Sequence, residues 1–239
     1  MADYTYHRVA GYVFTIVVHI SNIVYMHYGL EKVKHYYPEL KTFATLQPRY
    51  FTCWNFGLQI IYSFVALYCE FLVWRNSNDK KYKLNKHLKT LRDVIFAGIL
   101  WPSTMLVFTV FWSLYLIDRD LIFPKFADKA LTPISNHIIH TLIVTIVTWE
   151  VAFRQRDIPK SHIRNLGHWI FHLLLYFAVL AYTYNERGIW IYPILTNLYG
   201  TVYFFLILFV IVIISVSAYF LQWKVTRYFW GQRNFLKNS

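Results

Sequence analysis

Two polar features stand out in otherwise apolar stretches of the sequence. Thr52 begins one such stretch, and the string NHIIHT, Asn136 to Thr141, lies near one end of another. Polar side chains inside a bilayer are costly and usually mark function. A threonine hydroxyl is a weak nucleophile that needs a base within hydrogen-bond reach, and histidine can supply that base. The two features together suggest attack on an ester carbonyl.

The composition indicates an integral membrane protein without a sizeable soluble domain. Of the 239 residues, 57% are hydrophobic and 15% are charged, whereas a soluble domain carries roughly 25% charged residues. Because apolar blocks of about 20 residues span a hydrocarbon core and only helices or closed barrels can do so, we expect one all-α domain over residues 1–239. Its six predicted transmembrane helices cover residues 9–28, 50–74, 93–116, 131–153, 166–185 and 200–224.

The basic residues predict the orientation of these helices. Of the 24 lysines and arginines, 16 lie on the side of the two termini, most densely in the loop Asn76 to Arg92. The positive-inside rule therefore places both termini in the cytosol. The net charge of +12 fits contact with anionic membrane lipids and not with nucleic acid, because no basic region forms a domain of its own. Plasma membrane and endoplasmic reticulum both fit this pattern.

This orientation places Thr52 and the NHIIHT string on the same, non-cytosolic side. Spacings of three and four residues put Asn136, His137 and His140 on one helical face. Asn136 could orient a histidine or donate to an oxyanion, and spacing does not choose between His137 and His140 as the base. His140 lies about 13 Å into its block, deeper than Thr52, so the second span must start earlier, near Pro48, or the helices must tilt.

Other residues with metal or redox chemistry allow fewer conclusions. His168 and His172 lie four apart in the fifth span, a spacing that can hold a metal, and a histidine-rich lipid oxidase is one alternative. No pair of carboxylates completes a di-iron site, so we expect neither a metal nor another cofactor. Cys53 and Cys69 are 16 residues apart in one predicted helix, about 24 Å, and cannot form a disulfide with each other.

The remaining charged and aromatic residues can be assigned to the cytosolic or the non-cytosolic side of the membrane. Arg119 and Lys125, in a predicted non-cytosolic loop, could receive the free carboxylate of an amphipathic lipid. Trp190 and Tyr192 fit either an interfacial aromatic belt or the wall of a lipid pocket. Three carboxylates are expected near cytosolic span ends, exposed and too far away to assist Thr52: Glu70, Asp93 and Glu150.

Short motifs across nearly the whole chain resemble the androgen-inducible membrane proteins, six-span hydrolases of fatty acid esters of hydroxy fatty acids. Each motif is weak alone, but their order and spacing make the similarity strong. They are Phe51–Thr52, Leu91–Arg92–Asp93, Asp118 to Lys125 (DRDLIFPK), NHIIHT, Glu150 and Gly188 to Pro193 (GIWIYP).

The resemblance implies specific roles. The catalytic threonine of the family matches Thr52, and its catalytic histidine, the second of the N-H-x-x-H-T string, matches His140. His137 and Asn136 are then supporting candidates. The implied reaction releases a fatty acid and a hydroxy fatty acid, with the lipid substrate and the surrounding membrane lipids as partners and no protein partner indicated. The alternative is a lipid-binding or signalling membrane protein without catalysis.

Overall fold

The computed structural model describes residues 4–79 and 81–238, and the side chains of these residues up to Gly231. The described residues form helices and connecting loops, with no β-strand among them. Six helices are long and apolar enough to cross a membrane, which confirms the all-α, multi-pass prediction. They are Thr5–Val33, Phe51–Arg75, Lys86–Leu121, Pro133–Phe153, Ile163–Arg187 and Val202–Gly231.

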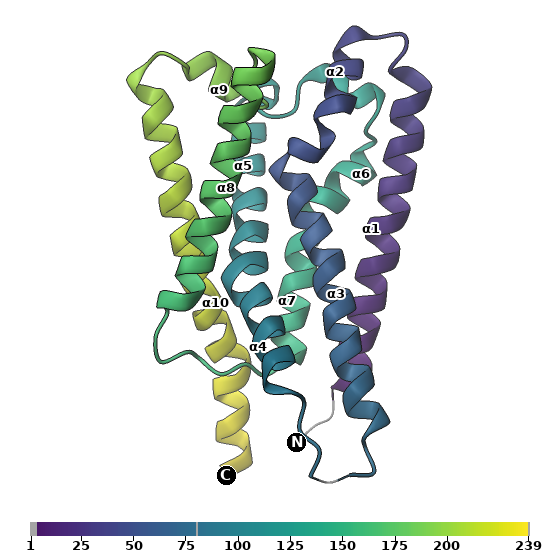
Figure 1. Cartoon of the computed structure of the whole chain (residues 1–239), viewed down its shortest axis with the longest axis vertical. Coiled ribbons are helices and arrows are strands. Elements are labelled where there is room, and N and C mark those ends of the chain that lie inside the picture. The colour runs from purple at the N-terminus through teal and green to yellow at the C-terminus, as the bar shows by residue number, and fades with distance from the viewer. Residues whose placement is uncertain (1–3, 80, 239) are drawn as a thin grey trace.

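The helices run along the long axis of the molecule, and the two ends of the described chain lie together at its lower end (Figure 1). Helix α1 packs against α3 and α7, and α10 packs against α5. Two short helices, α2 and α9, lie at the upper end. The bounds are α1 (Thr5–Val33), α2 (Pro38–Leu46), α3 (Phe51–Arg75), α4 (Lys86–Val94), α5 (Trp101–Asp118), α6 (Pro133–His137), α7 (Ile143–Phe153), α8 (Ile163–Arg187), α9 (Pro193–Leu198) and α10 (Val202–Asn238).

Two of the six spans contain a π-helical turn. The segment Ile95–Leu100 joins α4 to α5, and the segment Ile138–Leu142 joins α6 to α7. Pro102 follows the first of them, in the first turn of α5. Because proline lacks an N–H and its ring clashes with the preceding turn, we ascribe the wider turn before Pro102 to this residue. Such π-turns are rare and often occur at functional sites, and the second one contains His140.

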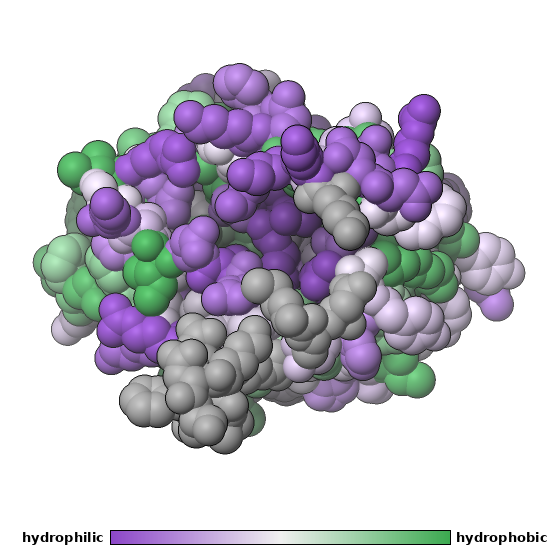
Figure 2. Space-filling view, turned by 90° about the horizontal axis from the view of Figure 1, so that it is seen from below, coloured by the Kyte–Doolittle hydropathy of each residue, from purple (hydrophilic) through white to green (hydrophobic). Residues whose placement is uncertain are grey.

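The outer surface of the bundle matches a lipid environment. Large apolar side chains such as Val17, Leu174 and Phe209 are more than half exposed on three different helices, as lipid-facing residues are expected to be. Seen from below, the lower face is mainly hydrophilic, with hydrophobic residues toward its edge (Figure 2). The apolar sides and the polar end indicate how the bundle sits across the membrane.

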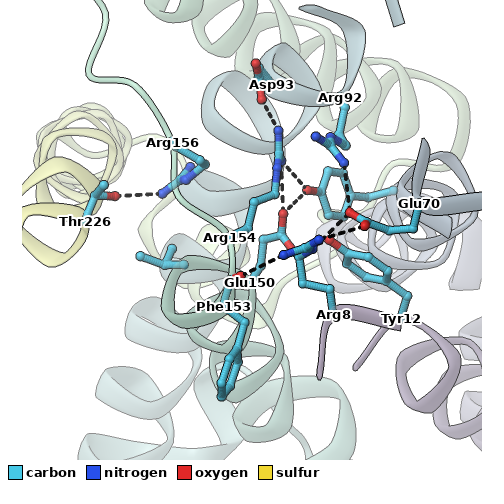
Figure 3. A network of polar contacts seen from close by, with 12 residues as sticks. Arg8, Tyr12, Glu70, Arg92, Asp93, Glu150, Phe153, Arg154, Arg156 and Thr226 are labelled. Carbon is cyan, nitrogen blue, oxygen red and sulfur yellow. Dashed lines mark hydrogen bonds and ion pairs between the residues drawn. The ribbon is translucent and has the colours of Figure 1, made fainter. Parts of the chain in front are cut away.

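The inside of the lower end holds a network of ion pairs (Figure 3). Glu150 accepts hydrogen bonds from the Tyr12 hydroxyl at 2.6 Å, from Tyr62, and from Arg154 at 3.0 Å. Arg154 also pairs with Asp93. A buried carboxylate is tolerated when a cation and hydrogen-bond donors replace its water, and this arrangement supplies both.

The network corrects the expectation that the three carboxylates near these span ends are exposed. Glu70 and Glu150 are buried, 6% and 3% exposed, whereas Asp93 is partly exposed. Glu70 binds Arg8 at 2.8 Å and Arg92 at 3.3 Å. The sequence placed these residues by depth alone, and the side chains turn inward because basic partners from α1, α4 and the segment after α7 meet them there.

A labelling experiment tests which end of the bundle faces the cytosol. In a background with Cys53 and Cys69 replaced by alanine, Ser77→Cys places a thiol in an exposed lower loop. Lys125→Cys places one at an upper position whose side chain is 79% exposed. In vesicles sealed with the cytosolic face outward, a membrane-impermeant maleimide is expected to label only Ser77→Cys, and after permeabilisation both variants. Labelling of Lys125→Cys alone in the sealed vesicles would reverse the predicted orientation.

Candidate active site

Thr52 is the second residue of α3. A 3₁₀ turn over Gln47–Arg49 and an extended Tyr50 precede it, and the helix begins at Phe51. The first N–H groups of a helix have no partner within the helix. Here the Phe51 N–H is satisfied by the hydroxyls of Tyr176 at 3.1 Å and Tyr192 at 3.0 Å. The start of α3 is therefore held by α8 and by the segment before α9.

His140 is positioned by the local structure of the fourth span. Thr132 caps α6 by accepting a hydrogen bond from the Ser135 N–H, and Pro133 occupies the first turn. The π-turn that follows contains His140. His140 is 5% exposed, and its ring stacks on Phe111 of α5, with ring centroids 3.4 Å apart. The ring is thereby fixed in one plane.

The central contact of the site joins the two spans. Thr52 Oγ1 lies 3.3 Å from His140 Nε2. On the other side of the ring, Nδ1 lies 3.1 Å from the backbone oxygen of Asn136 and 2.8 Å from its side-chain oxygen. Because a backbone carbonyl only accepts hydrogen bonds, the proton of a neutral ring sits on Nδ1. Nε2 is then an acceptor, directed at the threonine hydroxyl.

The two histidines of the NHIIHT string lie in different surroundings. His137 is exposed, hydrogen-bonds Thr141 Oγ1 at 3.1 Å and stacks on Trp112. The structure thus brings Asn136 and His140 together with Thr52 and leaves His137 on the outer side of the helix.

The expected difference in depth between Thr52 and His140 is closed in an unexpected way. Helix α3 starts at Phe51, so the second span is not lengthened toward Pro48 as a regular α-helix. Instead, the fourth span starts at Pro133, only seven residues before His140. Residues of α2 and of the segment 189–197 line the same cavity as Thr52 and cover it at the upper end. Thr52 therefore lies below the surface, at the level of His140.

Thr52 and His140 lie in the wall of a cavity of about 670 Å³. Its lining is mainly apolar and comes from α1, α2, α3, α5, α8, α9 and α10, together with the π-turn Ile138–Leu142 and loops at the upper end. No lysine or arginine of the described chain is among the lining residues, and Glu39 is the charged residue found there. A cavity of this size and polarity fits the apolar chains of a lipid.

Comparison with known proteins assigns the chain to a family. The model of the family described as FAR-17a/AIG1-like protein matches residues 14–225. The chain belongs to the FAR-17a/AIG1-like family. The match covers all six spans at least in part and confirms the resemblance seen in the sequence motifs.

Individual relatives agree with this assignment. The human androgen-dependent TFPI-regulating protein is 32% identical over 185 residues, which cover 77% of each chain. The rat protein of the same name is 28% identical over 216 residues, 87% of this chain and 88% of its own. The human androgen-induced gene 1 protein is 27% identical over 123 residues, about half of each chain. No solved structure matches the chain significantly.

The two basic residues considered for substrate binding lie outside the cavity of this FAR-17a/AIG1-like protein. Arg119 forms two hydrogen bonds of 2.8 Å with Asp128. The Lys125 side chain is 79% exposed and lies 3.9 Å from Asp120. Neither basic residue lines the cavity, although Phe123, between them in sequence, does. Arg119 and Lys125 could therefore bind a carboxylate only at the rim of the cavity, not inside it.

The structure of this family member also locates the histidines and cysteines that were considered for metal binding or a disulfide. Within the described part of the chain, no group of three or more His, Cys, Asp and Glu side chains could hold a metal ion. His172 packs among the rings of Phe51, Trp54 and Trp169. Cys53 and Cys69 are free thiols.

Sequence reasoning missed part of the site. Tyr176 is one of 20 tyrosines, and nothing in its sequence context separates it from the others. Tyr192 lies in the GIWIYP motif and was open to two interpretations, and the structure places both it and Trp190 in the cavity wall. The sequence signal for Trp190 and Tyr192 was their place in an aromatic motif that ends in proline at the edge of a span.

Asn136→Ala tests the positioning of the His140 ring in this FAR-17a/AIG1-like protein. The variant removes the 2.8 Å side-chain contact but keeps the backbone oxygen at 3.1 Å, so Nδ1 retains one acceptor. For the ester hydrolysis that the sequence resemblance implies, we expect kcat to fall about tenfold, below the 10²–10⁴ that a general base contributes, with KM unchanged. Steady-state kinetics with Asn136→Asp, which restores an acceptor, provide the comparison. Wild-type kcat in Asn136→Ala would contradict this role.

Proposed function

We propose that the protein is an intramembrane threonine hydrolase that cleaves fatty acid esters of hydroxy fatty acids. The observation that carries the proposal is the 3.3 Å contact between Thr52 Oγ1 and His140 Nε2. The backbone and side-chain oxygens of Asn136 accept hydrogen bonds from His140 Nδ1 and orient the ring for this contact. A nucleophile, a base within reach and a group that orients the base are the parts that acyl transfer by a hydroxyl requires.

The proposed reaction has two halves. In the first, Thr52 Oγ1 bonds to the ester carbonyl carbon while His140 Nε2 takes the hydroxyl proton. The tetrahedral intermediate collapses, the bond to the alkoxy oxygen breaks, and His140 returns the proton to the released hydroxy fatty acid. In the second, His140 takes a proton from water, the resulting hydroxide attacks the acyl-threonine, and the fatty acid leaves. The proton then returns to Thr52.

The cavity supports a substrate with long apolar chains. Its lining is apolar, which suits two hydrocarbon arms on either side of an ester. Because no lysine or arginine of the described chain lines it, the free carboxylate of the substrate is expected to stay at the upper membrane surface. Arg119 and Lys125 are the candidates to meet it there. The site then lies on the non-cytosolic side, in the plasma membrane or the endoplasmic reticulum.

Hydrolysis by purified protein tests this function. A panel of fatty acid esters of hydroxy fatty acids, with the branch point at different positions, is incubated with the wild type and with His140→Ala. We expect release of fatty acid by the wild type and a loss of at least about 10³-fold in the variant. A fluorophosphonate probe is expected to label the wild type, and labelling is expected to fail in Thr52→Ala.

Three results obtained with purified protein, from hydrolysis, ligand binding and elemental analysis, would overturn the proposal. Equal hydrolysis by wild type and His140→Ala would remove the base from the mechanism. Tight binding of the esters without any turnover would favour a lipid-binding or signalling role for the cavity. Stoichiometric iron in the purified protein would favour the histidine-rich lipid oxidase.

A further inference from the structure

The hydrolase mechanism requires stabilisation of negative charge inside an apolar cavity. When Thr52 attacks, the electron pair of the ester carbonyl moves onto its oxygen, and the resulting oxyanion must be met by hydrogen-bond donors. No lysine or arginine of the described residues lines the cavity. The donors must therefore be neutral, and they must lie beside Thr52.

Two tyrosine hydroxyls lie at the start of α3, next to Thr52. Tyr176 from α8 and Tyr192 from the segment before α9 both line the cavity. Their oxygens accept from the N–H of Phe51, the residue that precedes Thr52, at 3.1 and 3.0 Å. The two hydroxyls also bond to each other at 2.9 Å. Three polar atoms, the Phe51 nitrogen and the two hydroxyl oxygens, thus converge from three segments one residue away from the proposed nucleophile.

One of the two hydroxyl protons of Tyr176 and Tyr192 has no acceptor in the described part of the chain. The pair holds two hydroxyl protons, and Tyr176 uses its own to donate to Tyr192. Both oxygens otherwise act as acceptors of the Phe51 N–H. Within the described part of the chain, no acceptor takes the hydroxyl proton of Tyr192. Burial raises the pKa of Tyr192 to about 12, so this proton is retained at neutral pH.

We propose that the Tyr192 hydroxyl and the backbone N–H of Thr52 form the oxyanion hole of the hydrolase, with Tyr176 as a positioning residue. The Thr52 N–H belongs to the first turn of α3, where N–H groups have no partner within the helix. The positive end of the helix dipole adds to the attraction for the oxyanion. Tyr176 donates to Tyr192 and directs the remaining proton toward the cavity.

A second neutral donor of the cavity fits this role less well. The Trp190 indole nitrogen is buried without a partner, and Trp190 also lines the cavity. Its ring, however, packs among Tyr184, Tyr199 and Phe204. Among the described residues, no hydrogen bond or ring contact joins Trp190 to the start of α3, whereas Tyr192 accepts a hydrogen bond from the residue next to Thr52. Trp190 is therefore the rival against which the assignment is tested.

The test compares single hydroxyl deletions in purified protein. The inference rests on the proposed hydrolase function, so wild type and Thr52→Ala are measured alongside. We expect Tyr192→Phe to lower kcat by about 10²–10³-fold, the loss typical of a missing oxyanion donor, with KM nearly unchanged. Tyr176→Phe is expected to lower kcat by less than about tenfold, because Tyr192 keeps its proton. Tyr199→Phe, which deletes a hydroxyl from a residue outside the cavity lining, is expected to match the wild type.

Binding of a transition-state analogue gives a second readout. A long-chain trifluoromethyl ketone forms a tetrahedral adduct with a nucleophilic hydroxyl, and the adduct bears the oxyanion. Its affinity is expected to fall about 100-fold in Tyr192→Phe. The affinity for the corresponding secondary alcohol, which forms no adduct, is expected to stay unchanged, and this also shows that the cavity is intact.

The two proposals fail in different ways. If the wild type does not hydrolyse esters, or if Thr52→Ala remains active, the hydrolase function itself fails and this inference with it. If the wild type is active, Thr52→Ala is inactive and Tyr192→Phe keeps its kcat and its affinity for the ketone, only the oxyanion hole is overturned. A larger loss in Trp190→Phe than in Tyr192→Phe has the same consequence and assigns the role to the indole.

Discussion

Thr52→Ala will abolish ester hydrolysis while leaving the protein folded in the membrane. The variant removes the atom that lies 3.3 Å from His140 Nε2 and would form the acyl-enzyme. Removal of a nucleophile from a comparable constellation costs about 10⁴–10⁶-fold in kcat. Because Thr52 is half-buried and its side chain is small, folding should be nearly unaffected. The measurement is the hydrolysis rate of purified protein, with the melting temperature in detergent as the check on folding.

Thr52→Ser and Thr52→Val separate chemistry from shape. Serine keeps the hydroxyl and should retain measurable turnover and covalent labelling by the fluorophosphonate. Valine keeps the branched shape of threonine but no hydroxyl, and should be as inactive as alanine. Residual activity of Thr52→Val near that of the wild type would show that the hydroxyl is not the nucleophile.

Arg154→Met is expected to cause the largest loss of stability among single substitutions in the ion-pair network. Arg154 is 6% exposed and is shared by Glu150, by Asp93 and by the Tyr62 hydroxyl at 2.9 Å. Methionine keeps an apolar stem but leaves the buried Glu150 carboxylate without its cation. Breaking a buried ion pair in this way costs about 3–5 kcal/mol. Denaturant unfolding in detergent micelles measures the change in the free energy of unfolding.

Two further variants show whether burial is the cause. Lys89→Met removes one partner of an exposed pair, Lys89 and Asp157, separated by 3.9 Å, and should change the free energy of unfolding by less than about 1 kcal/mol. Combining Arg154→Met with Glu150→Gln removes both buried charges and should recover part of the loss. A loss below about 1 kcal/mol in Arg154→Met would show that Glu150 is solvated or held by its two tyrosines alone.

The transmembrane helices could be predicted because their signal is local. A run of about 20 apolar residues is sufficient to indicate a span, and the second, fourth and fifth predicted spans begin and end within three residues of the observed helices. The first and sixth helices extend beyond their predicted spans, to Thr5–Val33 and Val202–Gly231. The third is longer, Lys86–Leu121 instead of 93–116, because the polar first turns of α4 carry no hydropathy signal. Helices α2 and α9 were missed for the same reason, since both are short and lie outside the apolar blocks.

The site could be predicted only as far as its residue types and the shared end of the spans that carry them. Thr52 and His140 were singled out as polar residues in apolar spans, and the family resemblance favoured His140. Their contact depends on the π-turn at Ile138–Leu142 and on the late start of α6 at Pro133, which are not encoded in hydropathy. The buried carboxylates were misplaced because burial of a charge is decided by partners from distant helices.

The positions of the cavity and the ion-pair network give the molecule a chemical asymmetry across the bilayer. The cavity with Thr52 lies toward the upper end, and Arg154 with its ion-pair partners lies inside the lower end. Thr52 therefore lies nearer to the leaflet at the upper end. For an enzyme that is oriented as proposed and filled from that leaflet, substrate made in the cytosolic leaflet must first flip across, so the pace of lipid translocation, and not only the chemistry, would set how fast such esters are consumed in a cell.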